Sequence, residues 1–332
     1  MKTEDILREL CMCGGVSGAE DSASQKFVSL AKPYCGEINK DSMGNVWLCK
    51  KGSAKRKTLM IEAHADKIGL IVTGITDDGY LLFRGIGGID SKILPSVNVT
   101  VHGKRDLKGI IGSVPPHLRK KQKFSVDDLC IDIGYGAETA RSLVRVGDLV
   151  EFDTNYTELC GDYAAAGAFD DRAGLAAVIK TLEYLKDSDV NIVSVASSQE
   201  EVGCRGAKAA AYSINPDMYI CIDVTFGKTP DSRGGVFPLG GGTVITVGPN
   251  VQPYMSRKLK EIADNKKIPY SIDADGGNTG TNAWTVQVAR CGIPTALLSV
   301  PLRYMHTRYE VISVKDVEYT AKLTAEFAKE MC

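Results

Sequence analysis

Hydrophobic and polar residues change their pattern twice along the chain. At the start, the pattern predicts helices over residues 4–11 and 22–32, with Pro33 ending the second helix. A β-hairpin is predicted over residues 37–50, because turn-forming residues separate two short β-rich runs. A short strand is predicted over residues 59–63. The first part of the chain is therefore predicted to be α/β.

The pattern of hydrophobic and polar residues is different over residues 69–162. Short β-rich runs alternate with Gly, Asp and Pro turns, and clear amphipathic helices are almost absent. The runs are residues 70–75, 80–83, 96–101, 109–114 and 149–152. This pattern predicts a small all-β unit, either a barrel or a sandwich, inserted between α/β segments. We expect residues 1–68 and 163–332 to form one discontinuous domain around it.

Helices and strands alternate again after Tyr163. An apolar stripe predicts a helix over residues 173–186, and small residues predict a short helix over 207–212. The final helix is predicted to begin at a capping box, Ser313-x-x-Asp316, and to run to the C-terminus. Buried strands are predicted over residues 190–195, 218–222, 243–247 and 295–300.

Two adjacent glutamates, Glu200 and Glu201, follow the predicted strand 190–195. Carboxylates at the end of a buried strand are costly unless metal, cation or solvent compensates them. Neighbouring side chains in a strand point to opposite faces, so the backbone must turn if both glutamates serve one site. A solvated acidic loop is the alternative interpretation.

Other metal-binding residue types lie at the ends of further predicted strands. His64 and Asp66 follow the strand over 59–63, Asp223 follows 218–222, and His306 lies beyond 295–300. In open α/β sheets the carboxyl ends of the strands are where ligands bind. Asp170 and Asp171 precede the helix over 173–186, where an N-cap and an acidic first turn would account for one of them. A lone histidine could equally be structural.

Taken together, the strand ends predict a metal site. Two imidazoles and several carboxylates suit zinc, cobalt or manganese, whereas calcium would need more oxygen ligands. The candidates are His64, Asp66, Asp170, Glu200, Glu201, Asp223 and His306.

Composition narrows the class of protein. The 332 residues carry a net charge of −1, and the short basic runs at 51–57 and 119–123 are too small to indicate nucleic-acid binding. We find no apolar stretch of membrane-spanning length and no signal peptide at Met1, so no membrane association is expected.

Ten scattered cysteines favour buried free thiols in a reducing compartment, hence a cytoplasmic location. The glycine-rich runs lack the Lys-Ser/Thr of a P-loop and are interpreted as turns and pocket walls.

Five ordered motifs carry a resemblance to a known family. They are Glu62-Ala-His64-Ala-Asp66-Lys-Ile-Gly69, Phe169-Asp170-Asp171-Arg172-Ala-Gly174, Gln199-Glu200-Glu201-Val-Gly203-x-Arg205-Gly206, Asp223-Val-Thr225 and Arg303-Tyr-x-His306-Thr. With Ile86-Gly-Gly-Ile-Asp90 and residues 112–118, the chain resembles the TET-type, glutamyl-aminopeptidase-like metallopeptidases, some of which are called cellulase M or endoglucanase.

The resemblance implies a fold and an assembly. The fold would be α/β, a three-layer α/β/α metallopeptidase domain with a mixed central sheet and an inserted small β-barrel-like domain. That insertion would serve dimer contacts, and dimers would assemble into a tetrahedral dodecamer. The substrates would be peptides with a free N-terminus.

The resemblance also implies roles for single residues. Two divalent metal ions would be bridged by Asp170, one held also by His64 and Asp223, the other by Glu201 and His306. Glu200 would be the general base, and the Asp66 carboxylate would orient His64. The Asp170–Asp171 peptide bond would be cis, which is rare outside proline.

One departure from the family pattern concerns Asn282. Thr281-Asn282-Ala283 stands where the family would have Thr-Asp-Ala, which leaves the ligand set intact but affects the expected pocket polarity.

Three other functions compete with a metal-dependent aminopeptidase. A dinuclear amidohydrolase could remove acyl groups from amino acids, and a glycosidase would need two carboxylates flanking a sugar. A non-catalytic scaffold is the third. The ligand types at the strand ends favour metal-dependent hydrolysis.

Overall fold

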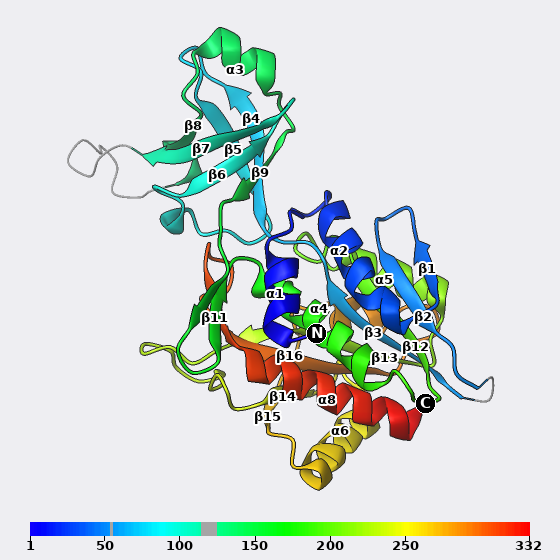
Figure 1. Ribbon diagram of the computed structural model, residues 1–332. Coiled ribbons are helices and arrows are strands. Elements are labelled where there is room, and N and C mark those ends of the chain that lie inside the picture. The colour runs from blue at the N-terminus through cyan, green and yellow to red at the C-terminus, as the bar shows by residue number, and fades with distance from the viewer. Residues whose placement is uncertain (54–55, 114–124) are drawn as a thin grey trace.

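The computed structural model describes residues 1–53, 56–113 and 125–332, and it has two parts (Figure 1). One part is a large mixed sheet with helices on both faces. The other is a closed six-stranded antiparallel barrel built from residues 69–152. This confirms the expected α/β fold with an inserted barrel. The predicted motif at 112–118 and the basic run at 119–123 lie largely or wholly outside the described residues.

The large sheet places its parallel strands at the centre. Its strands are β1 (Glu37–Lys40), β2 (Val46–Lys50), β3 (Thr58–His64), β10 (Thr157–Leu159), β11 (Tyr163–Ala166), β12 (Asn191–Ser197), β13 (Met218–Phe226), β14 (Thr243–Val247), β15 (Tyr270–Ala274), β16 (Thr295–Arg303) and β17 (Glu310–Ser313). They are ordered β1-β2-β12-β3-β13-β16-β17-β11-β10; in addition, β14 pairs with β16, and β15 pairs with β14. The neighbours β12, β3, β13 and β16 are parallel, so their carboxyl ends share one edge.

Helices cover the two faces of this sheet. They are α1 (Thr3–Cys11), α2 (Asp21–Ala31), α4 (Phe169–Tyr184), α5 (Arg205–Ile214), α6 (Pro253–Lys266), α7 (Asn282–Val286) and α8 (Val314–Met331). Helices α1, α2, α4 and α8 pack on one face and α5 and α7 on the other. Short 3-10 helices span Lys32–Tyr34, Ser91–Ile93 and Val126–Asp128.

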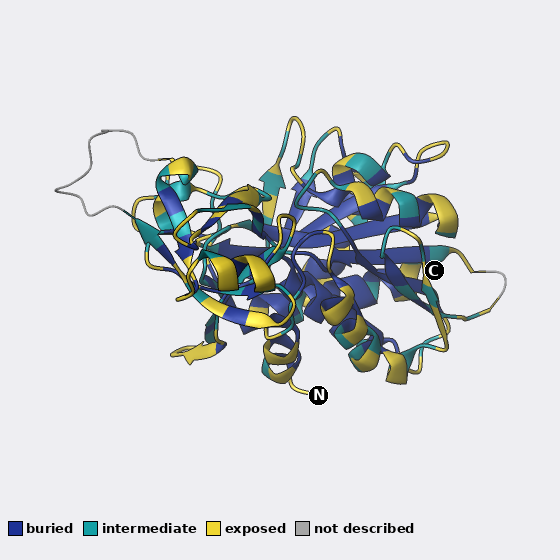
Figure 2. Ribbon diagram, turned by 90° about the horizontal axis from the view of Figure 1, so that it is seen from above, coloured by how far each residue is buried: buried dark blue, intermediate teal, exposed yellow. Residues whose placement is uncertain are grey.

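Alternation along the strands explains the three layers. On β3, Leu59 and Ile61 belong to the core under α4 and α8, whereas Met60 belongs to the core under α5 and α7. Successive strand residues point to opposite faces, so a strand buried on both sides reads as a continuous apolar run. Figure 2 shows the result: the central strands of the sheet are buried, whereas the outer strands β1 and β10 and the outer surfaces of the helices are exposed.

The barrel has a core of its own. Its strands are β4 (Gly69–Ile75), β5 (Leu81–Ile86), β6 (Asn98–His102), β7 (Asp106–Ser113), β8 (Leu129–Asp132) and β9 (Leu149–Phe152), closed in the order β4-β5-β8-β7-β6-β9. Its inward-facing residues form a hydrophobic cluster separate from those of the sheet. Closure leaves no unpaired strand edge. The hydrophobic pattern did not predict β8 or the helix α3 (Ala137–Leu143).

Two local predictions need correction. The capping box at the start of α8 is wrong: Ser313 is the N-cap residue but makes no side-chain capping bond, because Asp316 instead accepts hydrogen bonds from the amides of Gly240 and Gly242. The cysteines are all free thiols, but only Cys11, Cys221 and Cys332 are buried. Among the described helices, none is long and apolar enough to cross a membrane.

Candidate metal centre

The predicted site residues converge at the carboxyl edge of the parallel strands. His64 ends β3, the loop carrying Glu200 and Glu201 follows β12, and His306 follows β16. Asp223 lies within β13 rather than after it, because that strand (Met218–Phe226) extends beyond the predicted end at residue 222. Because these four strands are parallel neighbours, their ends bring these side chains together.

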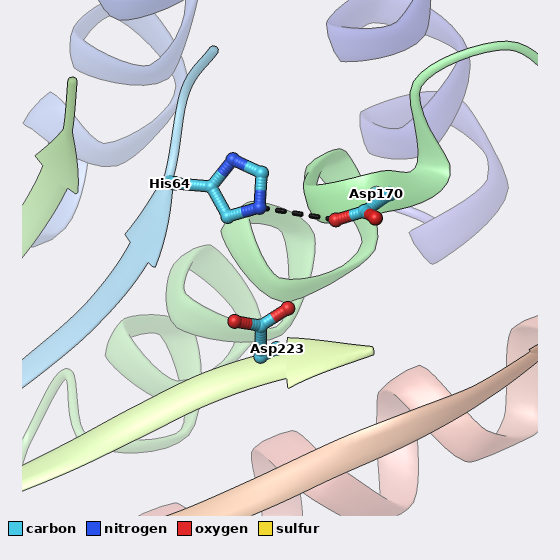
Figure 3. Close-up of side chains that lie close together, drawn as sticks. All are labelled: His64, Asp170 and Asp223. Atoms are coloured by element: carbon cyan, nitrogen blue, oxygen red, sulfur yellow. Dashed lines mark hydrogen bonds and ion pairs between the residues drawn. The ribbon is translucent and has the colours of Figure 1, made fainter. Parts of the chain in front are cut away.

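Three buried residues form the first cluster. His64, Asp170 and Asp223 each offer one possible ligand atom, and these atoms lie within 4.8 Å of one another. Figure 3 shows the His64 ring pointing at Asp170, with Asp223 approaching from β13. His64 Nε2 is 3.0 Å from Asp170 Oδ1.

A second cluster uses the other oxygen of Asp170. Asp170, Glu201 and His306 also place their possible ligand atoms within 4.8 Å of one another. His306 Nε2 is 3.3 Å from Asp170 Oδ2 and 3.4 Å from Glu201 Oε2. Asp170 is therefore shared, with one carboxylate oxygen directed at each imidazole. The Asp170–Asp171 bond is cis, as predicted.

Both imidazoles are oriented by main-chain carbonyls. His64 Nδ1 is 3.1 Å from the carbonyl oxygen of Asp66, and His306 Nδ1 is 2.8 Å from that of Gly88. A proton on Nδ1 that is donated to a carbonyl leaves Nε2 with its lone pair, which is the form that binds metal. The Asp66 carboxylate is farther from His64, at 3.4 Å, so the carbonyl is the nearer partner.

The Asp66 carboxylate instead holds the loop that carries the glutamates. Its oxygens accept hydrogen bonds from the amides of Glu200 and Glu201, at 2.9 and 3.1 Å, and from the Ser17 hydroxyl. The loop turns sharply before them, since Gln199 has a φ of 56°. This is the turn that two adjacent glutamates require if both are to face one site.

Glu200 and Glu201 have different surroundings. Glu201 belongs to the second cluster, whereas the Glu200 Oε1 atom accepts a hydrogen bond from the Cys204 thiol at 3.0 Å. Burial raises the pKa of Glu200 and takes that of Glu201 to about 8, the latter also through repulsion from Asp170. Glu200 belongs to neither cluster, so its carboxylate is available to accept and donate a proton.

Two further parts of the site, Glu310 and the Gly87–Gly88 turn, were not recognised as functional from the sequence. Glu310 accepts hydrogen bonds from the amides of Asp170 and His306. The Gly87–Gly88 turn of the barrel packs against Glu201 and His306. Gly87 and Gly88 lie in a motif that contributed to the family resemblance, but the sequence did not indicate that they contact Glu201 and His306.

Asn282 lies in a buried hydrogen-bond network. It is buried on α7, and its amide donates to Glu62 Oε1 at 2.8 Å and to the Ser197 hydroxyl at 3.1 Å. Asp171 is likewise structural, since its carboxylate accepts the amides of Gly174 and His64. Asp171 thus supplies the helix cap that the sequence suggested for one of the two aspartates.

The charges of the centre fit divalent cations. Burial raises the pKa of Asp223 well above its usual value, because the nearby carboxylates add repulsion to the loss of solvent. Burial also opposes ionisation of Asp170, but hydrogen bonds from His306 and His64 hold its pKa below the usual range. Buried carboxylates packed this closely need positive charge, and imidazole with carboxylate is a typical donor set for zinc or cobalt.

Comparison with known proteins decides the family. The sequence profile of the M42 glutamyl aminopeptidase family matches residues 44–323. A lysyl aminopeptidase of Pyrococcus furiosus is 37% identical over 98% of this chain and 97% of its own length. This chain belongs to the M42 family.

Solved structures of M42-like proteins share the whole fold. An aminopeptidase of Desulfurococcus kamchatkensis superimposes with a TM-score of 0.93 and 34% identity, covering 99% of this chain and 94% of that one. The Pyrococcus horikoshii TET1 peptidase, described as assembling into a tetrahedron or a large octahedral shell, gives 0.87 and 32% over 99% and 100%. A Thermotoga maritima structure that bears the name endoglucanase gives 0.79 and 30% over 98% and 96%.

Proposed function

We propose that this M42 protein is an aminopeptidase that uses two divalent cations and Glu200 to release the N-terminal residue of peptides. The position of Asp170 carries the proposal, because its two oxygens face His64 and His306 separately, as a bridging carboxylate would. His64 and Asp223 would complete one ion site and Glu201 and His306 the other. Zinc or cobalt suits these donors best, and manganese is compatible with them.

The side chains have distinct tasks in this reaction. Divalent ions at such a centre lower the pKa of water and polarise a carbonyl. Glu200 takes the proton of the attacking water and passes it to the leaving amine, as a general base and then acid. The loop held by Asp66 keeps Glu200 beside the centre. The acidic residues attract the α-ammonium group of a peptide, which favours removal of N-terminal residues over internal cleavage.

Metal dependence and the need for a free N-terminus are tested together. Dialysis against a chelator should abolish release of amino acids from an aminoacyl-amide panel, and zinc, cobalt or manganese should restore it. An N-acetylated panel should remain uncleaved. Full activity in protein shown by elemental analysis to lack metal would refute the proposal.

Two alternative activities give different results in the same assay. A deacylase would cleave the N-acetylated substrates and spare the free peptides. A glycosidase would hydrolyse cellulose in the presence of chelator, since it needs only two carboxylates. The two imidazoles facing Asp170 argue against the glycosidase, which has no use for metal ligands, whereas a dinuclear deacylase would use the same ligands and is separated from the aminopeptidase by the assay alone.

We also propose that the barrel serves assembly. Relatives of this fold include a peptidase that forms tetrahedral shells. The barrel exposes apolar side chains, among them Tyr80, Leu82, Ile110 and Val146. Light scattering should show dimers or a dodecamer at micromolar concentration, and a monomer would contradict this assignment.

A further inference from the structure

Glu310 connects two residues of the candidate centre through their main chains. It is 2% exposed at the start of β17. Its Oε2 atom accepts a hydrogen bond from the amide of Asp170 at 3.1 Å, and its Oε1 atom accepts one from the amide of His306 at 3.0 Å. One side chain therefore fixes the backbone of both the shared carboxylate and the second imidazole.

Both of these backbone segments need such a partner. His306 has a φ of 58° and Tyr304 one of 63°, so the segment between β16 and β17 adopts a left-handed conformation that is unfavourable for residues other than glycine. Asp170 has non-helical dihedral angles at the start of α4, where amides have no helical acceptor. Without Glu310, the buried amide of Asp170 and the partly buried amide of His306 would lose their acceptor.

The charge of Glu310 is not used for an ion pair. Among the described residues, no Lys, Arg or His side chain pairs with it. A buried carboxylate without a cation costs free energy. A carboxylate at this buried position is explained if its two oxygens are needed as acceptors for the two amides.

We infer that Glu310 is a positioning residue for the second ion site, the one formed by Asp170, Glu201 and His306. It acts by fixing the main chains of Asp170 and His306 and touches neither ion nor substrate. The inference rests on the proposed function, which supplies the second ion. Outer partners of metal ligands typically change metal affinity by about 10–100-fold when they are replaced.

Glu310→Gln tests this with minimal change in shape. The amide nitrogen of Gln would face a main-chain N–H, so one of the two acceptors is lost. In zinc or cobalt titrations followed by calorimetry, we expect wild type to bind two ions. The variant should bind the second ion about 10–100-fold more weakly and should lose less affinity for the first, whose other donors, His64 and Asp223, lie on strands. Raising the free metal concentration should restore turnover.

Asp316 provides a matched control. It is another fully buried carboxylate whose oxygens accept two main-chain amides, those of Gly240 and Gly242, at 2.7 and 2.8 Å. It contacts none of the cluster residues. Asp316→Asn should lower the melting temperature but leave both metal affinities unchanged.

Different results would overturn the role of Glu310 and the proposed function. Wild-type affinity for both ions in Glu310→Gln overturns it, as does equal weakening of the second ion in Asp316→Asn. If Glu310→Gln fails to fold by circular dichroism, Glu310→Asp decides, because it keeps the charge but shortens the reach and should weaken the second ion selectively. A wild type that binds fewer than two ions would instead refute the two-ion mechanism.

Discussion

The two halves of the candidate centre are built differently although they share Asp170. His64 and Asp223 lie on adjacent parallel strands, and both are buried. Glu201 and His306 lie on loops, and the His306 side chain is 34% exposed. A strand fixes its side chains through ladder hydrogen bonds, whereas a loop needs partners from elsewhere. The first half therefore depends on the sheet, and the second on contacts from Asp66, Glu310 and the barrel.

This difference predicts that the two ion sites bind metal with unequal affinity. Ordered strands cost little further entropy when they bind an ion, while loop residues must be held in place to bind equally well. We expect the ion at the second half to leave first during graded chelation. The four predictions below test that view, from the largest effect to the smallest.

Replacing the shared residue should have the largest effect. Asp170→Asn removes the negative charge that faces both imidazoles, so both ions should be lost and turnover should fall to background. Asp223→Asn, the comparison variant, removes a donor of the first half alone and should keep the second ion. Elemental analysis of both proteins measures the difference. One ion retained at wild-type affinity in Asp170→Asn would show that the halves are independent.

The two neighbouring glutamates should fail in different ways. Glu200→Gln keeps the size of the side chain but loses its basicity, so kcat should fall by roughly 10²–10⁴-fold with both ions retained. Glu201→Gln replaces an anionic donor by a weak neutral one, so one ion should bind weakly and added metal should recover part of the activity. Metal content measured beside kcat distinguishes them, and the opposite pattern would reverse their roles.

The strand-based half was the easier to predict from sequence. His64 and Asp223 follow apolar runs that predict buried strands, and parallel strands bring their carboxyl ends together. The roles of single residues came from the family resemblance rather than from the pattern. Glu310 and Gly88 could not be found, because their contacts join segments distant in sequence and depend on backbone atoms that carry no sequence signal.

Local chemistry also misled the sequence analysis where tertiary contacts prevailed. Ser313-x-x-Asp316 fits a capping box, yet the Asp316 carboxylate is used by two glycine amides of another loop. The sequence likewise did not indicate that the Asn282 amide donates to the buried Glu62. In both cases the partner lies far along the chain.

The barrel turn offers a smaller perturbation of the loop-based half. A Cβ at Gly88 would lie 2.9 Å from His306 Nδ1, so Gly88→Ala should displace the imidazole and weaken the second ion by roughly tenfold. Gly85→Ala is the control, since its Cβ would meet Ile89 at an ordinary 3.6 Å. Metal titration of the two variants measures the effect. Equal affinities would show that the barrel does not support the second half.

The smallest effect is expected at Cys204, which separates the role of Glu200 from that of the ion sites. Its thiol donates to Glu200 Oε1 at 3.0 Å, and a thiol is a weak donor, so the bond contributes about 1 kcal/mol or less. Cys204→Ala should lower kcat by at most about fivefold, with metal content and KM unchanged. Cys204→Ser keeps a donor at the same backbone φ of 53° and should retain more activity. If both variants lose metal, the thiol supports the loop as a whole; if Ser and Ala are equally impaired with metal intact, the size of sulfur matters and its hydrogen bond does not.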